Sequence, residues 1–126
     1  MGSTILAVDD SKTVRASLEY TLEKNGYNIE IAENGKEGLE VLKRLYSNNN
    51  KPSMIISDIN MPVMDGITFI KEVKSEAKYK FIPILVLTTE SQKDKKMEGK
   101  KAGAAGWLVK PFKNEQLLGV VKKFVK

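Results

Sequence analysis

Short apolar runs alternate along the chain with longer segments in which apolar residues recur every three or four positions. The runs are Thr4 to Val8, Tyr27 to Ala32, Met54 to Ser57, Ile84 to Leu87 and Ala105 to Val109. Runs of this length are typical of strands, and the segments between them have the period of helices. The alternation predicts an α/β fold, with a parallel sheet covered by helices on both faces.

Polar residues and glycines mark where the helical segments begin and end. Ser11 and Asp65 can cap the helices that follow them, and Asn25-Gly26 can end the first helix. The residues expected to face the core are Val14, Leu18, Leu22, Leu39, Leu42, Tyr46, Ile67, Ile70, Val73, Leu117, Val121 and Phe124. The segment from Ser91 to Ala102 has only Met97 as a large apolar residue, so we expect that helix to be weakly anchored.

The strand runs end in side chains that suit a metal ion or a phosphoryl group. Asp9 and Asp10 follow the first run, Asp58 the third, Thr88 the fourth and Lys110 the fifth. The carboxyl ends of parallel strands share one edge, where open α/β sheets bind their ligands. We therefore expect these residues, which are far apart in sequence, to meet at one site.

Composition narrows the chemistry of that site. The chain has 126 residues, enough for one domain, and contains neither cysteine nor histidine. Any metal would therefore have to be held by oxygen ligands. No apolar stretch approaches the ~20 residues of a membrane helix, and no signal-peptide pattern opens the chain, so we expect a cytoplasmic protein without a membrane partner.

The net charge of +5 comes largely from lysines in the last third of the chain. Many of them lie at Lys93, Lys95, Lys96, Lys100, Lys101, Lys122, Lys123 and Lys126. A solvated helix face explains them better than nucleic-acid binding, because neither arginines nor aromatic clusters interleave with them. The charge therefore predicts no nucleic-acid partner and indicates an anionic partner only weakly.

The loop after the first run argues against a bound nucleotide or flavin phosphate. It has no glycine-rich turn, and Asp9 and Asp10 would repel a bare phosphate. Together with Asp58 they make the kind of oxygen site that Mg²⁺ prefers. Taken singly, these acids could be helix caps or turn residues. Thr88 and Lys110 favour a functional site over caps and turns, because a hydroxyl and an ammonium suit a phosphoryl group carried by Asp58.

Four short motifs lie at these strand ends. They are Val8-Asp9-Asp10-Ser11, Ser57-Asp58-Ile59-Asn60-Met61-Pro62 with Met64-Asp65-Gly66, Leu87-Thr88-Thr89-Glu90, and Lys110-Pro111-Phe112. Together they resemble the receiver domains of two-component response regulators, and among these the single-domain chemotaxis regulators of the CheY type. The resemblance covers essentially the whole chain, as a single receiver without an output domain. It implies a doubly wound, flavodoxin-like sheet in the order 2-1-3-4-5, of which CheY itself is a standard example.

The resemblance implies a role for each acidic residue. Asp58 would accept a phosphoryl group from a sensor histidine kinase or from a small donor such as acetyl phosphate. Mg²⁺ would be held by Asp10, Asp58 and the backbone carbonyl of Asn60, with Asp9 acting through water. The protein would catalyse its own phosphorylation and dephosphorylation but would not turn over an external substrate, so we do not expect an enzyme in the usual sense.

The same resemblance implies how the signal leaves the site. Thr88 and Lys110 would contact the phosphoryl group, and the bond from Lys110 to Pro111 would be cis. Trp107, where the family more often has tyrosine or phenylalanine, would turn inward and change the face made by the fourth helix, fifth strand and fifth helix. Alternatively, it is a static aromatic at the sheet edge. A target such as a flagellar motor switch protein would bind this face, with the receiver acting as a monomer.

Residues beside the line of water attack would set the lifetime of the acyl phosphate. The resemblance places Asn60 and Glu90 there, as in the fast-decaying chemotaxis type, although both could be ordinary loop residues. Three other interpretations stay open. They are a Mg²⁺-dependent aspartyl-phosphate phosphohydrolase, in which Asn60 could not serve as the second acid, a flavodoxin-like nucleotide-binding or cofactor-binding module, and a receiver-like domain that works unphosphorylated.

Overall fold

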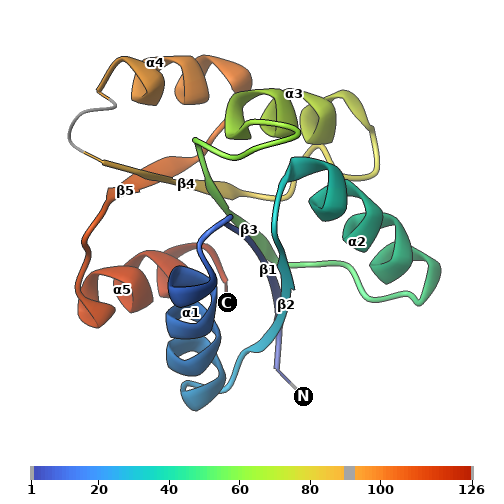
Figure 1. The fold of residues 1–126 in the computed structure, drawn as a ribbon. Coiled ribbons are helices and arrows are strands. Elements are labelled where there is room, and N and C mark those ends of the chain that lie inside the picture. The colour runs from blue at the N-terminus through green and yellow to red at the C-terminus, as the bar shows by residue number, and fades with distance from the viewer. Residues whose placement is uncertain (1, 90–92, 126) are drawn as a thin grey trace.

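Within residues 2–89 and 93–125, which the computed structural model describes, a five-stranded parallel sheet lies between two layers of helices (Figure 1). The strands are β1 (Thr4–Val8), β2 (Asn28–Ala32), β3 (Met54–Asp58), β4 (Ile84–Thr88) and β5 (Gly106–Val109). The helices are α1 (Lys12–Lys24), α2 (Gly35–Ser47), α3 (Gly66–Ser75), α4 (Lys93–Ala102) and α5 (Asn114–Phe124). The strand order β2-β1-β3-β4-β5 confirms the predicted fold. In this part of the chain, no helix combines the length and the apolar character needed to cross a bilayer.

The predicted helix starts are confirmed by two caps. The Ser11 side chain accepts a hydrogen bond from the backbone N–H of Val14 at 3.3 Å, and Asp65 accepts one from that of Thr68 at 2.9 Å. Gly26, just after α1, has a φ of 91°, a region that glycine enters without steric cost. Strand boundaries differ from the predicted ones by at most one residue, so the apolar pattern placed these elements well.

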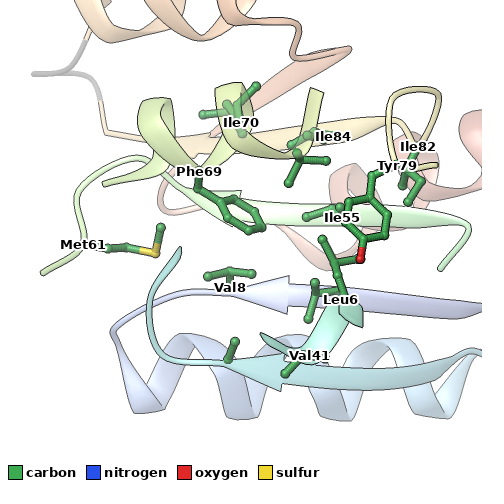
Figure 2. Packing of buried hydrophobic residues seen from close by; sticks show 14 of the residues in the cluster. Leu6, Val8, Val41, Ile55, Met61, Phe69, Ile70, Tyr79, Ile82 and Ile84 are labelled. Atoms are coloured by element: carbon green, nitrogen blue, oxygen red, sulfur yellow. The ribbon is translucent and has the colours of Figure 1, made fainter. Parts of the chain in front are cut away.

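Two apolar clusters cover the opposite faces of the sheet, because successive strand residues point to opposite sides. One cluster lies under α2 and α3, where Figure 2 shows Leu6, Val8 and Ile55 with Phe69. The other lies under α1 and α5 and includes Leu117. The central strands β1, β3 and β4 are buried at every position, whereas β2, at the sheet edge, is partly exposed. This contrast agrees with the strand order, in which β3 is central and β2 is at the edge.

The buried face of α2 is rotated from the predicted one. Leu39 and Tyr46 are only partly buried, and the buried large side chains are Val41, Leu42 and Leu45. The reason is Gly38, whose Cα faces Phe69 of α3 so closely that a Cβ there would lie 2.9 Å from the ring. The helix therefore packs along the stripe that contains this glycine, which brings Val41 inward.

The attachment of α4 to the sheet relies on small residues. Met97, the large apolar residue of this helix, is 57% exposed. Gly99 is buried instead, and a Cβ there would make ordinary 3.7 Å contacts with Ile67 and Val86. A glycine lowers helix propensity and buries little apolar area. The helix therefore buries little large apolar side chain, although Ala102 also packs against the cluster under α2 and α3. That α4 is weakly anchored stays a prediction.

Candidate functional site

Three carboxylates converge at the carboxyl ends of β1 and β3. One oxygen each from Asp9, Asp10 and Asp58 lies within 4.8 Å of the others. Asp9 and Asp58 are buried, and Asp10 is exposed at the mouth of the cluster. The acids meet because β1 and β3 are parallel neighbours, with Val8 opposite Ser57. The structure thus brings together the acidic residues predicted from the strand ends.

Lys110 reaches the same acids from the end of β5. Its Nζ donates a hydrogen bond to Asp9 Oδ2 at 2.8 Å and lies 3.4 Å from Asp58 Oδ2. Burial by itself lowers the pKa of this ammonium, but the hydrogen bond to Asp9 and the charges of Asp58 and Asp9 outweigh it and raise the pKa. Lys110 is therefore a permanent cation in the cluster. The peptide bond between Lys110 and Pro111 is cis, as the resemblance implies.

The carboxyl group of Asp58 is held in place but crowded. The backbone N–H of Ile59 donates to Asp58 Oδ1 at 2.8 Å, and Oδ2 faces Lys110. Burial first, and the neighbouring charge of Asp9 second, raise the pKa of Asp58 to about 6, although Lys110 and the Ile59 N–H act in the opposite direction. One ammonium therefore does not fully neutralise the cluster.

The donor set fits a hard divalent cation. Mg²⁺ prefers carboxylate and carbonyl oxygens together with water, and its charge would relieve the crowding of Asp9, Asp10 and Asp58. Because Asp10 is exposed, the cluster stays open to solvent and to a ligand oxygen.

Thr88 is the last residue of β4, the strand beside β3. Its side chain is fully buried, yet Oγ1 has no hydrogen-bond partner among the residues that the structure describes. A buried hydroxyl without a partner costs roughly 1–3 kcal/mol. Leu87, the residue before it, pairs with Asp58 across the sheet. A hydroxyl without a partner can donate a hydrogen bond to a ligand that comes within its reach.

Arg15 supports the cluster from α1, a role that the sequence prediction missed. Its Nη1 donates to the backbone carbonyl of Asp9 at 2.7 Å in the interior, and its Nη2 lies 3.6 Å from the Glu33 carboxylate. This side chain joins the loop after β1 to the loop after β2. The sequence contained a signal for this role, because Arg15 lies three residues before Leu18 and so on the apolar stripe of the helix. A charged side chain on that stripe needs a buried partner.

The loop between β3 and α3 has a tight geometry that the sequence did not reveal. A Cβ on Gly66 would overlap the carbonyl oxygen of Asp58, so only glycine fits there. Val63 has a φ of 70°, and the N–H of Met64 donates to the carbonyl of Pro62 at 2.7 Å. This is a γ-turn of the rare, strained type, which a β-branched residue normally avoids.

The other predicted site residues lie around this centre. Asn60 is exposed, two residues after Asp58. Glu90 lies outside the described residues. Trp107 is opposite Val86 in the pairing of β4 with β5, two positions before the residue that faces Thr88. Trp107 and Thr88 therefore share one face of the sheet, although Trp107 does not belong to the acid cluster.

Residues 5–122 match the response regulator receiver domain family. The chain belongs to this family. The receiver is 45% identical to the chemotaxis protein CheY4 of Vibrio cholerae, with a TM-score of 0.87 that covers 99% of this chain and 100% of that one. It is 41% identical over 123 residues to the sensor histidine kinase CheAY of Helicobacter pylori, covering 97% of this chain and 15% of that protein.

A third relative, the response regulator MprA of Mycobacterium leprae, is 37% identical over 122 residues, covering 97% of this chain and 50% of its own length. The receiver thus spans half or less of these two curated relatives. Receivers are signalling switches of two-component systems rather than classical enzymes, and they interact with histidine kinases and downstream targets. They bind Mg²⁺ in an acidic active site, and this receiver has such an acidic cluster.

Proposed function

We propose that this receiver accepts a phosphoryl group on Asp58 from a sensor histidine kinase. The observation that carries the proposal is the setting of Asp58 Oδ2, which lies 3.4 Å from Lys110 Nζ while the buried Thr88 hydroxyl lacks a partner among the described residues. In the reaction, a carboxylate oxygen attacks the phosphorus of a phosphohistidine. A P–O bond forms, the P–N bond breaks, and the imidazole leaves.

Each residue of the cluster has a task in this reaction. The bond from the Ile59 N–H fixes Asp58 Oδ1, which leaves Oδ2 as the attacking atom. With a pKa of about 6, Asp58 is largely ionised at about pH 7.5 and so is ready to attack. Lys110, already beside Oδ2, stabilises the negative charge of the incoming phosphoryl oxygens. The Thr88 hydroxyl donates a hydrogen bond to one of these oxygens.

Asp10, Asp58 and the backbone carbonyl of Asn60 would hold Mg²⁺, with Asp9 acting through water. When bound, the ion supplies positive charge that offsets the carboxylates and the phosphoryl oxygens. Asp9 keeps its direct partners in this arrangement, because its Oδ1 accepts the N–H of Ser11 and its Oδ2 accepts from Lys110. These two bonds support a role for Asp9 beyond direct metal ligation.

The lifetime of the acyl phosphate depends on how water reaches it. Asn60 is exposed at the mouth of the site. We assign Asn60 and Glu90 to the path of the attacking water, which makes the phosphorylated state short-lived. The likeness to CheY4 and CheAY supports a chemotaxis-type role for such a fast switch.

The output is binding of a target protein by the receiver itself, at the face made by α4, β5 and α5. Trp107 is 39% exposed on this face, and a hollow of about 820 Å³ lies beside it, lined also by Val109 and Gln116. When Thr88 turns to the phosphoryl group, Trp107 follows it inward and the face changes. The lysines of α4 favour an acidic partner surface, such as one on a flagellar motor switch protein, bound by a monomeric receiver.

Mass spectrometry tests the proposed chemistry. Incubation with acetyl phosphate and Mg²⁺ should add one phosphoryl group, and Asp58→Asn or an excess of EDTA should abolish the adduct. Asp94→Asn, which removes an exposed acid of α4, should leave it intact. An adduct that persists in Asp58→Asn would place the acceptor elsewhere. Turnover of phosphomonoesters without an adduct on Asp58 would favour the phosphohydrolase.

A further inference from the structure

Trp107 lies where its position can report on the acid cluster. It is the single tryptophan of the chain and is on β5, the edge strand next to β4. In the sheet, Trp107 is opposite Val86 and Thr88 is opposite Val109, so the indole and the Thr88 side chain extend from the same face. Helix α4 covers this face, with Gly99 over Val86. An inward movement of the ring therefore leads along the sheet toward Thr88.

The outward position of the ring has a specific contact with α4. Lys96 Nζ lies 5.4 Å from the centroid of the Trp107 ring, which is within cation–π range. Tryptophan gives the strongest such interaction of the aromatic side chains. In the described part of the chain Lys96 has no ion pair within 4.0 Å, whereas the neighbouring Lys95 pairs with Glu98. The charge of Lys96 is thus directed to the indole rather than to a carboxylate.

The contact matters because α4 has few large apolar side chains that are buried. The helix carries an exposed Met97, and its buried contact with Val86 and Ile67 is made by a glycine. A ring that leaves its outward position loses Lys96, so this contact stabilises only one of the two ring positions. A contact made in only one of two conformations shifts the equilibrium between them by the free energy of that contact.

We infer that Lys96 is a positioning residue that holds Trp107 outward and thereby sets how strongly the receiver responds to a phosphoryl group. The inference rests on the proposed function, in which Trp107 turns inward when Asp58 is phosphorylated. Phosphorylation has to break the contact with Lys96. By linkage, removing the contact strengthens the binding of any phosphoryl mimic by the factor to which the free energy of the contact corresponds. For an exposed cation–π pair this factor is about 2- to 5-fold.

Beryllofluoride, a phosphoryl mimic, tests this with the full chain and Mg²⁺. Trp107 fluorescence reports the titration directly, because no other tryptophan contributes. Lys96→Met should strengthen binding about 2- to 5-fold, and Lys96→Arg should restore the wild-type value, because a guanidinium also stacks on an indole. Lys100→Met is the matched control, since it removes the same charge one turn further along α4 and should leave the affinity unchanged.

A second background separates the cation–π contact from a general charge effect. With Trp107→Leu, followed by calorimetry, Lys96→Met should no longer change the affinity for beryllofluoride. Equal effects of Lys96→Met and Lys100→Met, or an effect that persists without Trp107, would overturn the role of Lys96 while leaving the proposed function intact. Binding of beryllofluoride to the wild-type protein in calorimetry without any change in Trp107 fluorescence would overturn the switch-setting role. Absence of any binding in calorimetry would instead refute the proposed function, and the switch-setting role with it.

Discussion

Replacing Asp58 by asparagine should stabilise the metal-free receiver at neutral pH. Burial and the charge of Asp9 raise the pKa of Asp58 from 3.8 to about 6. The folded state therefore holds this proton more tightly than the unfolded state does, and ionising the group above pH 6 costs folding free energy. The shift corresponds to ~3 kcal/mol at about pH 7.5. Asparagine keeps the shape of the side chain and can keep the hydrogen bond from the Ile59 N–H, but its amide faces the Lys110 ammonium. We therefore expect the free energy of unfolding to rise by about 1–3 kcal/mol.

The sign of the pH dependence distinguishes this effect from an ordinary ion pair. The destabilisation by Asp58 is fully present above the folded pKa of about 6 and is lost as the pH falls toward the unfolded value of 3.8. Linkage gives a cost of ~1.6 kcal/mol at about pH 5 and ~0.6 kcal/mol at about pH 4. The advantage of Asp58→Asn should therefore shrink steadily on acidification. A carboxylate stabilised by a salt bridge would show the opposite trend.

Urea unfolding in EDTA at about pH 7.5, 5 and 4 measures the difference directly. Glu40→Gln is the matched control, because it removes an exposed acid of α2 and should change stability little. Added Mg²⁺ should narrow the gap, since the ion binds three carboxylates better than two. The reasoning is refuted if Asp58→Asn is no more stable than Glu40→Gln near neutral pH, or if its gain does not depend on pH.

Three further tests, two of them with a control variant, address other parts of the structure. Thr88→Val removes the buried hydroxyl that lacks a partner among the described residues, so it should keep or raise stability by about 1 kcal/mol in urea unfolding, yet it should abolish the fluorescence response to beryllofluoride. Gly99→Ala in α4 and Gly119→Ala in α5 should each stabilise their helix by about 1 kcal/mol, because a Cβ fits at both positions. Only Gly99→Ala should also reduce the fluorescence response to beryllofluoride. Arg15→Met should cost roughly 1–3 kcal/mol and weaken Mg²⁺ binding in a titration, because a buried carbonyl of the acid cluster loses its donor. Arg44→Met, which loses an exposed pair, should do neither, and equal effects of the two arginine variants would contradict the role of the buried one.

The sheet and the acid cluster could be predicted because both depend on short-range patterns. Apolar runs define the strands, and a residue directly after a strand lies at the sheet edge whatever the helices do. This is why Asp58 and Lys110, which are far apart in sequence, were expected together and lie 3.4 Å apart. Caps such as Asp65 are equally local, since the side chain bonds to its own helix.

The missed features depend on partners that are distant in sequence. The inward face of α2 is set by Gly38 against Phe69, a contact between two helices that no periodicity encodes. The role of Arg15 depends on the backbone carbonyl of Asp9, which comes within reach of its guanidinium only when the loop after β1 has formed. The strained turn at Val63 contradicts the local preference of its residue type. The contact of Lys96 with Trp107 likewise requires the placement of α4 over β5.

The hydrogen bond from Lys110 to Asp9 joins positions 101 residues apart, the last strand to the first. During synthesis, Asp58 leaves the ribosome well before Lys110 does. An incomplete chain therefore carries the acids without their ammonium, and it lacks the strand end that supplies it. If Asp58 is the phosphoryl acceptor, as proposed, competence to hold a phosphoryl group would arise only when β5 has joined the sheet. Unfinished or misfolded copies would then take no phosphoryl group from the kinase, so the geometry of the site would restrict signalling to folded receivers.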